Sequence, residues 1–182
     1  MNSNNFFSHI GSTDMAAFIH TARKSVIYAA PSIQKIPAQA MIDVSRELGA
    51  EMLTVNLDVD EHVLRMGYGE LDAIKLLHES GIAITHSPQL RTALLIVDDQ
   101  GFSFTSTALY LESENSSPNA YNAIRLTSEQ VKEASARLSA VAKSIAVAQA
   151  ETLDEKERLQ NIPVEIEFHP IEQEVIEIID KK

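Results

Sequence analysis

Two polar side chains, Asp98 and Ser106, come at the ends of neighbouring apolar runs and could take part in chemistry together. The uninterrupted run 93–97 indicates a buried strand that ends at Asp98. A turn over 98–101 follows, and 102–106 pairs back most simply as a hairpin partner. We expect the two strands to place polar groups at one end of a sheet. A carboxylate and a hydroxyl would then face one cleft, where they could bind or act on a polar ligand.

The standard motifs for phosphate, metal and thiol chemistry do not occur. Gly67 and Gly69 form only G-x-G, without the third glycine of a phosphate-binding loop. The six histidines do not pair at a spacing of four residues on a helix, and the chain has no cysteine. Thiolate catalysis, disulfides and cysteine-ligated zinc are therefore excluded. We expect no metal and no cofactor.

The segment around these strands resembles the phospholipase D superfamily, whose pattern is H-x-K-x4-D followed by G-S-x-N. The match runs through 90–98 and then 105–108. The order of the surrounding elements is also similar, with 22–26 entering a first strand and Pro31 leaving it. The resemblance covers roughly residues 14–110. It implies an α/β domain that forms half of a two-part site, with the second half supplied by a pseudo-repeat or by a second subunit.

The functional positions of the motif are mostly replaced. Asp98 and Ser106 are kept. The family's His, Lys, Gly and Asn correspond here to Arg91, Ala93, Thr105 and Ala108. In the family, catalysis proceeds through a phosphohistidine, with the lysine binding phosphate. Arg91 cannot act as a nucleophile, because a guanidinium stays protonated at neutral pH. The resemblance therefore implies a non-catalytic domain that serves dimerisation, recognition of a ligand or partner, or regulation within a larger protein or complex.

The groups that remain suggest a binding site for an anion. Arg91 is a planar donor suited to phosphate or carboxylate, and Ser106 and Lys24 could help it to hold an anion. We expect Asp98 to pair with Arg91 when no ligand is bound. A plainer alternative is that Asp98 only caps a turn and that Arg91 is a solvated strand residue. A further alternative is a phosphodiesterase, of nuclease or lipase type, with rearranged residues and His86 as a displaced nucleophile.

Hydrophobic periodicity predicts an α/β fold, a mixed sheet flanked by helices. Apolar runs mark the expected strands, which are 26–30, 52–57, 82–86 and 93–97 with its hairpin partner. Helices are expected to start near Asp14, Pro37 and Glu70, with Gly49 and Gly81 as stops after the second and third.

The C-terminal part contains the clearest helix signal. Thr127 and Gln130 form a capping box, and the helix is expected to run from Ser128 to about Gln160. Apolar residues at alternating steps of three and four form a heptad-like seam: Val131, Ala134, Leu138, Val141, Ile145 and Ala148. The seam, with Val131, Leu138, Val141 and Ile145 at its centre, packs either on its own domain or between two subunits.

The predicted organisation has four parts. Residues 1–112 form the phospholipase D-like domain, and 113–126 form a loop and a final strand. Residues 127–161 form the long helix. Residues 162–182 form an acidic extension, with a strand at 164–168 and a helix at 171–179, that we expect to be truncated before a downstream domain.

The charge of the chain limits its partners. The chain has 26 acidic and 15 basic residues, a formal net charge of −11, and residues 151–182 hold ten of the acidic and four of the basic ones. Nucleic-acid binding, a third functional alternative, is disfavoured because it needs a basic surface. The N-terminus does not resemble a signal peptide, and no apolar run is long enough to span a membrane. We expect a cytoplasmic protein that forms homodimers.

Overall fold

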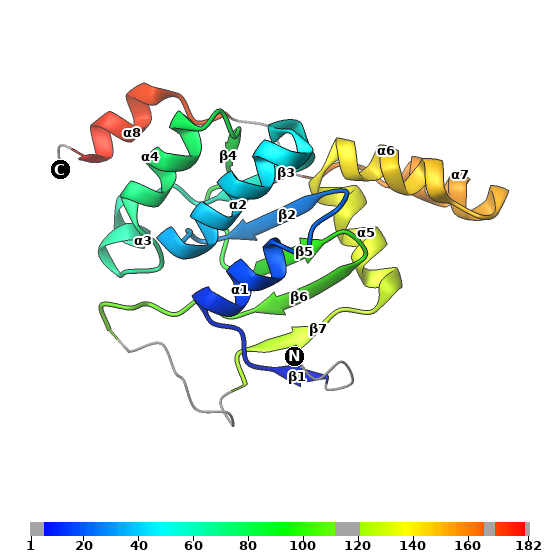
Figure 1. The fold of residues 1–182 in the computed structure, drawn as a ribbon, viewed down its shortest axis with the longest axis horizontal. Helices are drawn as coiled ribbons and strands as arrows, with labels where there is room; N and C mark the ends of the chain where they lie inside the picture. Colours follow the sequence, from blue (N-terminus) through cyan, green and yellow to red (C-terminus); the bar gives the residue numbers. More distant parts are fainter. Residues whose placement is uncertain (1–5, 112–120, 166–169, 181–182) are drawn as a thin grey trace.

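A seven-stranded mixed sheet forms the centre of the molecule, with strand order β1-β7-β6-β5-β2-β3-β4 (Figure 1). The computed structural model describes residues 6–111, 121–165 and 170–180. The strands are β1 (Phe7–Ser8), β2 (Val26–Ala30), β3 (Leu53–Leu57), β4 (Ile84–His86), β5 (Ala93–Val97), β6 (Gln100–Phe104) and β7 (Ala123–Arg125). The predicted α/β class is confirmed.

The central strand β2 explains why the sheet is mixed. All five of its residues are buried, as expected for a strand that is covered on both faces. It pairs in parallel with β3 and antiparallel with β5, so that Tyr28 lies between Val55 and Leu95. Strand β4 continues the parallel half, and β5, β6, β7 and β1 form the antiparallel half.

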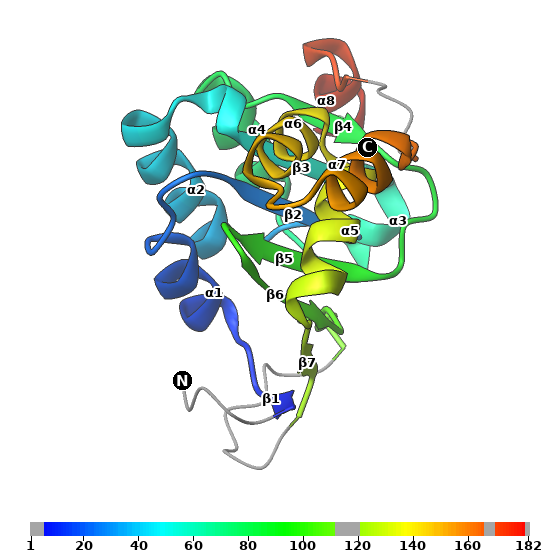
Figure 2. The same cartoon turned by 90° about the vertical axis from the view of Figure 1, so that its right-hand side faces the viewer.

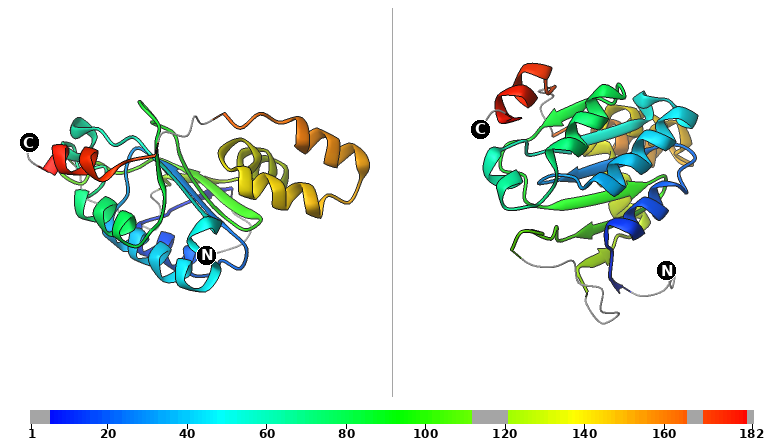
Figure 3. Two further views of the ribbon diagram at one scale, coloured as in Figure 1. Left: turned by 90° about the horizontal axis from the view of Figure 1, so that it is seen from above. Right: turned by 60° about the vertical axis from the view of Figure 1, so that its left-hand side comes forward.

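One face of the sheet is covered by the N-terminal helices. These are α1 (Ser12–Ile19), α2 (Lys35–Leu48) and α4 (Leu71–Glu79), together with the short helices η1 (Ala50–Met52) and α3 (Glu61–Arg65) near the ends of β3. Seen from above, α1, α2 and α4 line one side of the sheet (Figure 3, left). Their apolar faces meet β2, β3 and β5 in the main core, where Met41, Ile74 and Leu77 are fully buried.

The opposite face carries three short helices in place of the single long helix predicted over 128–160. They are α5 (Ser128–Leu138), α6 (Ala140–Gln149) and α7 (Leu153–Asn161). Helices α6 and α7 project beyond the sheet (Figure 1) and lie in front of it when the molecule is seen from that end (Figure 2). The prediction failed because two polar residues begin new helices. The Ser139 backbone is extended and its side chain accepts from the Ala142 N–H, and Thr152 accepts from the Glu155 N–H in the same way.

The heptad-like seam packs within the chain where it is buried. Val131 lies against Ile27 and Ile96 of the sheet, and Leu138 packs beside the same cluster. Val141 and Ile145 come after the break at Ser139. Val141 is exposed and Ile145 is half-buried. The capping box of Thr127 and Gln130 is confirmed at the start of α5.

The residues after 112 belong to the same α/β unit as those before. Strand β7 extends the sheet, and the helix predicted at 171–179 is α8 (Gln173–Asp180), which packs beside α4. Ile171 and Ile176 are buried in the main core. The strand predicted at 164–168 is not formed at Val164 or Glu165, and its other residues lie outside the described part. In the described ranges, no helix has the length and apolar character needed to cross a membrane.

Candidate functional site at the carboxyl edge of the parallel strands

The parallel strands end at one edge of the sheet, and polar residues follow each of them. Ser32 comes after β2, Asp58 after β3 and Ser87 after β4. Arg91, just before β5, reaches the same edge because β5 runs antiparallel to β2. Ser106, just after β6, reaches it because β6 is antiparallel to β5 and therefore runs in the same direction as β2. Ligands of open α/β sheets usually bind outside the carboxyl ends of the strands, which makes this edge the candidate site.

The structure divides the predicted cleft between two edges. Arg91 and Ser106 lie at the carboxyl edge, next to the paired residues Ala93 and Phe104. Asp98 and Lys24 lie at the opposite edge, because Asp98 follows the other end of β5. Since each strand residue adds about 3.3 Å, five residues separate the two groups by roughly 15 Å. The expectation that Asp98 and Ser106 share one cleft is therefore wrong.

Asp98 caps the backbone that leads into β2. It sits in the hairpin turn with a positive φ of 55°, and its carboxylate accepts from the backbone N–H groups of three consecutive residues. The shortest of these contacts is 2.7 Å, to the Lys24 nitrogen. The hydrogen bond between Lys24 and Asp98 thus comes from the Lys24 main chain. Lys24 also lines a hollow beside α5 and α6. The alternative in which Asp98 caps local structure matches this geometry.

Arg91 pairs with Asp58, and not with Asp98 as expected. The Arg91 Nη1 atom lies 2.5 Å from Asp58 Oδ2. The Asp58 side chain is only 4% exposed, whereas that of Arg91 is 59% exposed. The guanidinium therefore balances a buried negative charge. An anionic ligand at Arg91 would have to compete with this carboxylate.

His86 is held in one tautomer beside this ion pair. Its Nδ1 atom accepts from the Val59 N–H at 3.2 Å, so the ring proton resides on Nε2. In the described ranges His86 has no hydrogen bond to a hydroxyl or a carboxylate. Within the described ranges, His86 therefore does not form the hydrogen-bonded nucleophile and base pair that the displaced-nucleophile alternative would need.

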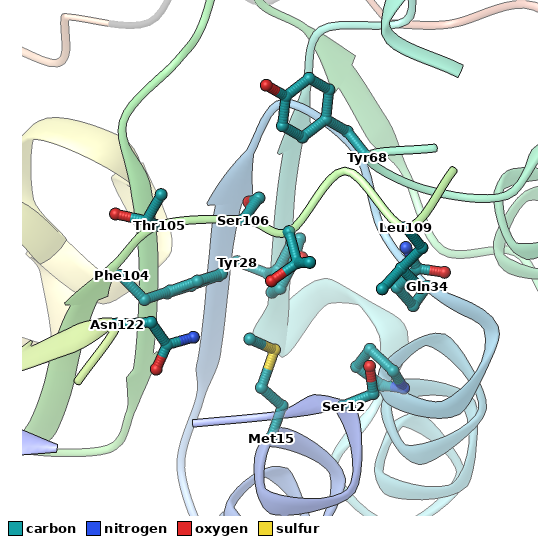
Figure 4. A pocket seen from close by; sticks show the side chains of 12 residues that line it. Ser12, Met15, Tyr28, Gln34, Tyr68, Phe104, Thr105, Ser106, Leu109 and Asn122 are labelled. Atoms are coloured by element: carbon teal, nitrogen blue, oxygen red, sulfur yellow. The ribbon is translucent and has the colours of Figure 1, made fainter. Parts of the chain in front are cut away.

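One hollow on this edge, the Ser106 pocket, holds about 30 Å³ (Figure 4). That volume fits one or two waters, or one polar group of a ligand. The pocket lies between α1, α2 and the strands β2 and β6. It is lined by Ser12, Met15, Tyr28, Gln34, Pro37, Tyr68, Phe104, Thr105, Ser106, Thr107, Leu109 and Asn122. None of these side chains is charged.

Ser106 differs from the other polar groups of the pocket whose bonds are known. Its Oγ is fully buried and has no hydrogen-bond partner among the residues that the structure describes. By contrast, the Tyr28 hydroxyl donates to the Ser32 carbonyl at 3.0 Å, and the Gln34 amide donates to the Gly67 carbonyl at 3.2 Å. Burial raises the pKa of Tyr28 above its usual value, so this phenol keeps its proton. A buried hydroxyl without a partner costs about 1–3 kcal/mol.

Two helices begin at the pocket, and a carboxylate accepts a hydrogen bond from the backbone at the N-terminus of each. Asp14 accepts from the Gly11 N–H at 3.1 Å at the start of α1. Glu70 accepts from the Lys35 N–H at 2.6 Å at the start of α2. These acidic groups offset the positive ends of the helix dipoles. The pocket is therefore polar and close to electrically neutral.

No family model, no curated protein and no solved structure matches the chain. The resemblance to phospholipase D thus rests on the sequence pattern and stays a prediction.

The sequence suggested Ser106 and Arg91, which both lie at this edge, but it did not suggest the groups around them. Asp58 follows an apolar strand directly, which was a usable signal for this edge. Tyr68 lies between two glycines, and Gly67 has a positive φ of 83°. A Cβ on Gly69 would lie 2.1 Å from Ser32 Oγ, so this loop packs closely enough to bring Tyr68 to the pocket.

Proposed function

We propose that this chain is a non-catalytic, phospholipase D-like recognition domain that binds a small uncharged polar ligand in the Ser106 pocket. The observation that carries the proposal is the buried Ser106 hydroxyl, which lines a hollow and has no hydrogen-bond partner in the described part of the chain. A hydroxyl in that state stabilises nothing within the fold. A ligand with a hydroxyl, amide or carbonyl group would complete its hydrogen bonding.

The charges around the site favour an uncharged ligand over the anion expected from the sequence. The pocket has no charged lining residue, and Arg91 is balanced by Asp58. Lys24, the other cation of the expected anion site, belongs to the opposite edge of the sheet. A ligand that carried a full charge would lose its hydration at this site without gaining an opposite charge.

The residues at the positions of the family's histidine and lysine cannot carry out its covalent chemistry. Arg91 occupies the position of the nucleophilic histidine, and the lysine position is Ala93, which is fully buried. A phosphodiesterase would hydrolyse bis-p-nitrophenyl phosphate and lose that activity in His86→Ala. We expect no turnover by the purified chain, and a turnover lost in His86→Ala would contradict the proposal.

The direct test is a titration followed by the backbone amide signals in NMR. The probes are acetamide, N-methylacetamide and glycerol, with inorganic phosphate as the charged comparison. We expect saturable shifts for Tyr68 and residues 104–107 with at least one uncharged probe. Dissociation constants in the millimolar range are expected for fragments of this size.

Two results would overturn the proposal. One is the absence of saturable shifts at the Ser106 pocket with any of the uncharged probes. The other is a phosphate response centred on Arg91 that exceeds every response to the uncharged probes. The second result would restore the anion site that the sequence suggested.

A further inference from the structure

The two edge strands of the sheet, β4 and β1, differ in what covers them. At the β4 edge, Pro170 forms a bridge with Thr85, and the Ile171 N–H donates to the Ile84 carbonyl. This edge is thus covered by the chain's own residues. At the other edge lies β1, which pairs only with β7 among the described strands (Figure 1). An uncovered edge strand is a template for pairing with another chain.

The β1 edge carries a cluster of exposed aromatic rings. Phe6, Phe7 and Tyr121 are 61%, 56% and 61% exposed. The rings of Phe6 and Phe7 lie 4.9 Å apart, and those of Phe7 and Tyr121 lie 6.0 Å apart. The rings therefore form one patch, and large aromatic side chains supply much of the binding energy of protein interfaces.

The charge pattern indicates what this edge pairs with. The chain has a net charge of −11, so two copies repel each other over most of their surfaces. Residues 6–10 and 121–124, however, contain no Asp, Glu, Lys or Arg. The charged residue that follows, Arg125, is engaged with the Phe102 ring at 5.0 Å and with Gln100. The edge also lacks the lysines and prolines that usually block edge-to-edge pairing.

We propose that a second copy of this chain docks on the β1 edge, with the two β1 strands antiparallel across a twofold axis. Such a contact is self-complementary, because the same residues meet from both sides. It brings the aromatic patches of the two copies, with Phe6, Phe7 and Tyr121 in each, close to one another beside the joined edges. It also joins the copies at an uncharged part of an acidic surface. The interface adjoins the Ser106 pocket, since the lining residue Asn122 follows Tyr121 and donates its backbone N–H to the Ser8 carbonyl, but it does not depend on a ligand there.

The test is sedimentation equilibrium of the full chain between about 5 and 300 µM. Phe7→Lys adds a charge at the centre of the edge, and Leu153→Lys is the matched control, because Leu153 on α7 is 84% exposed and far along the chain. We expect the wild type and Leu153→Lys to dimerise alike. Phe7→Lys should raise the dissociation constant at least about tenfold, the factor that corresponds to the loss of one aromatic contact. Tyr121→Lys gives a second variant at the same edge.

Salt provides an independent readout. Because repulsion between the acidic copies is screened by salt, wild-type dimerisation should strengthen between about 0.05 and 0.5 M NaCl. A wild type that stays monomeric over the whole range of concentration would overturn the proposal. So would a dimer that survives both Phe7→Lys and Tyr121→Lys, or one that Leu153→Lys breaks to the same extent. Circular dichroism confirms that each variant is folded, and an unfolded variant is replaced by the other edge variant.

Discussion

Asp58 and Arg91 pair across the ends of β3 and β5, with 2.5 Å between Oδ2 and Nη1, although 33 residues separate them in the chain. The Asp58 carboxylate neutralises the charge of Arg91, the arginine that the sequence suggested for anion binding. It also leaves the neutral Ser106 pocket as the better place for a ligand. The pair has consequences for stability that can be measured.

We expect Arg91→Ala to lower the free energy of unfolding by about 1–2 kcal/mol, because it leaves the buried Asp58 carboxylate without its partner. Arg91→Lys keeps a cation in reach and should cost less than Arg91→Ala. Urea denaturation measures both. The loss in Arg91→Ala should largely vanish in a background of Asp58→Asn, where no buried charge remains. Equal losses in both backgrounds would show that the pair is not coupled.

The break between α5 and α6 should also be visible in stability. Ser139→Ala removes the hydroxyl that accepts from the Ala142 N–H and from the Thr54 hydroxyl. The loss of such a helix cap costs about 1 kcal/mol, and the stranded Thr54 hydroxyl adds to it. Ser144→Ala, an exposed position in the middle of α6, is the matched control and should be neutral or slightly stabilising. A Ser139→Ala variant as stable as the control would favour one continuous helix.

The buried Tyr28 phenol predicts a loss of stability at alkaline pH. Burial raises the pKa of Tyr28 in the folded state, whereas in the unfolded chain its pKa is about 10. Above pH 10 the unfolded state therefore binds fewer protons, and stability falls by up to about 1.4 kcal/mol per pH unit from this group. Urea denaturation at pH 9 and pH 11 measures the fall. It should be smaller in Tyr28→Phe, and an equal fall in both proteins would contradict this assignment.

Much of the fold could be predicted from the sequence, because its strands are marked by local signals. The run 26–30 ends at Pro31 and the run 93–97 ends at a turn, and both are strands with these bounds. The prediction of one long helix over 128–160 was wrong, and the reason is also local. The spacing of apolar residues continues past Ser139 without a gap, so the heptad-like pattern gives no sign that a new helix begins there.

The site could be predicted only in part, because its contacts join distant segments. Ser106 was found through a motif, but the partner of Arg91 depends on how β3 lies relative to β5. The separation of Asp98 from Ser106 was within reach of the sequence, since a five-residue strand cannot bring its two ends together. The hydrogen bond from the Lys35 N–H at the start of α2 to Glu70 could not be predicted, because it depends on the conformation of the loop that contains Gly67 and Gly69.

We propose that the Ser106 hydroxyl serves to bind a ligand and does not stabilise the fold. The most direct measurement compares Ser106→Ala with the wild type and with Ser144→Ala, in both stability and binding of the uncharged probe that shifts residues 104–107. Ser106→Ala should be as stable as the wild type or more stable by up to about 1 kcal/mol, because a costly unpartnered group is removed. It should bind the probe at least about tenfold more weakly, while Ser144→Ala binds normally. A Ser106→Ala variant that binds the probe as tightly as the wild type would contradict the claim.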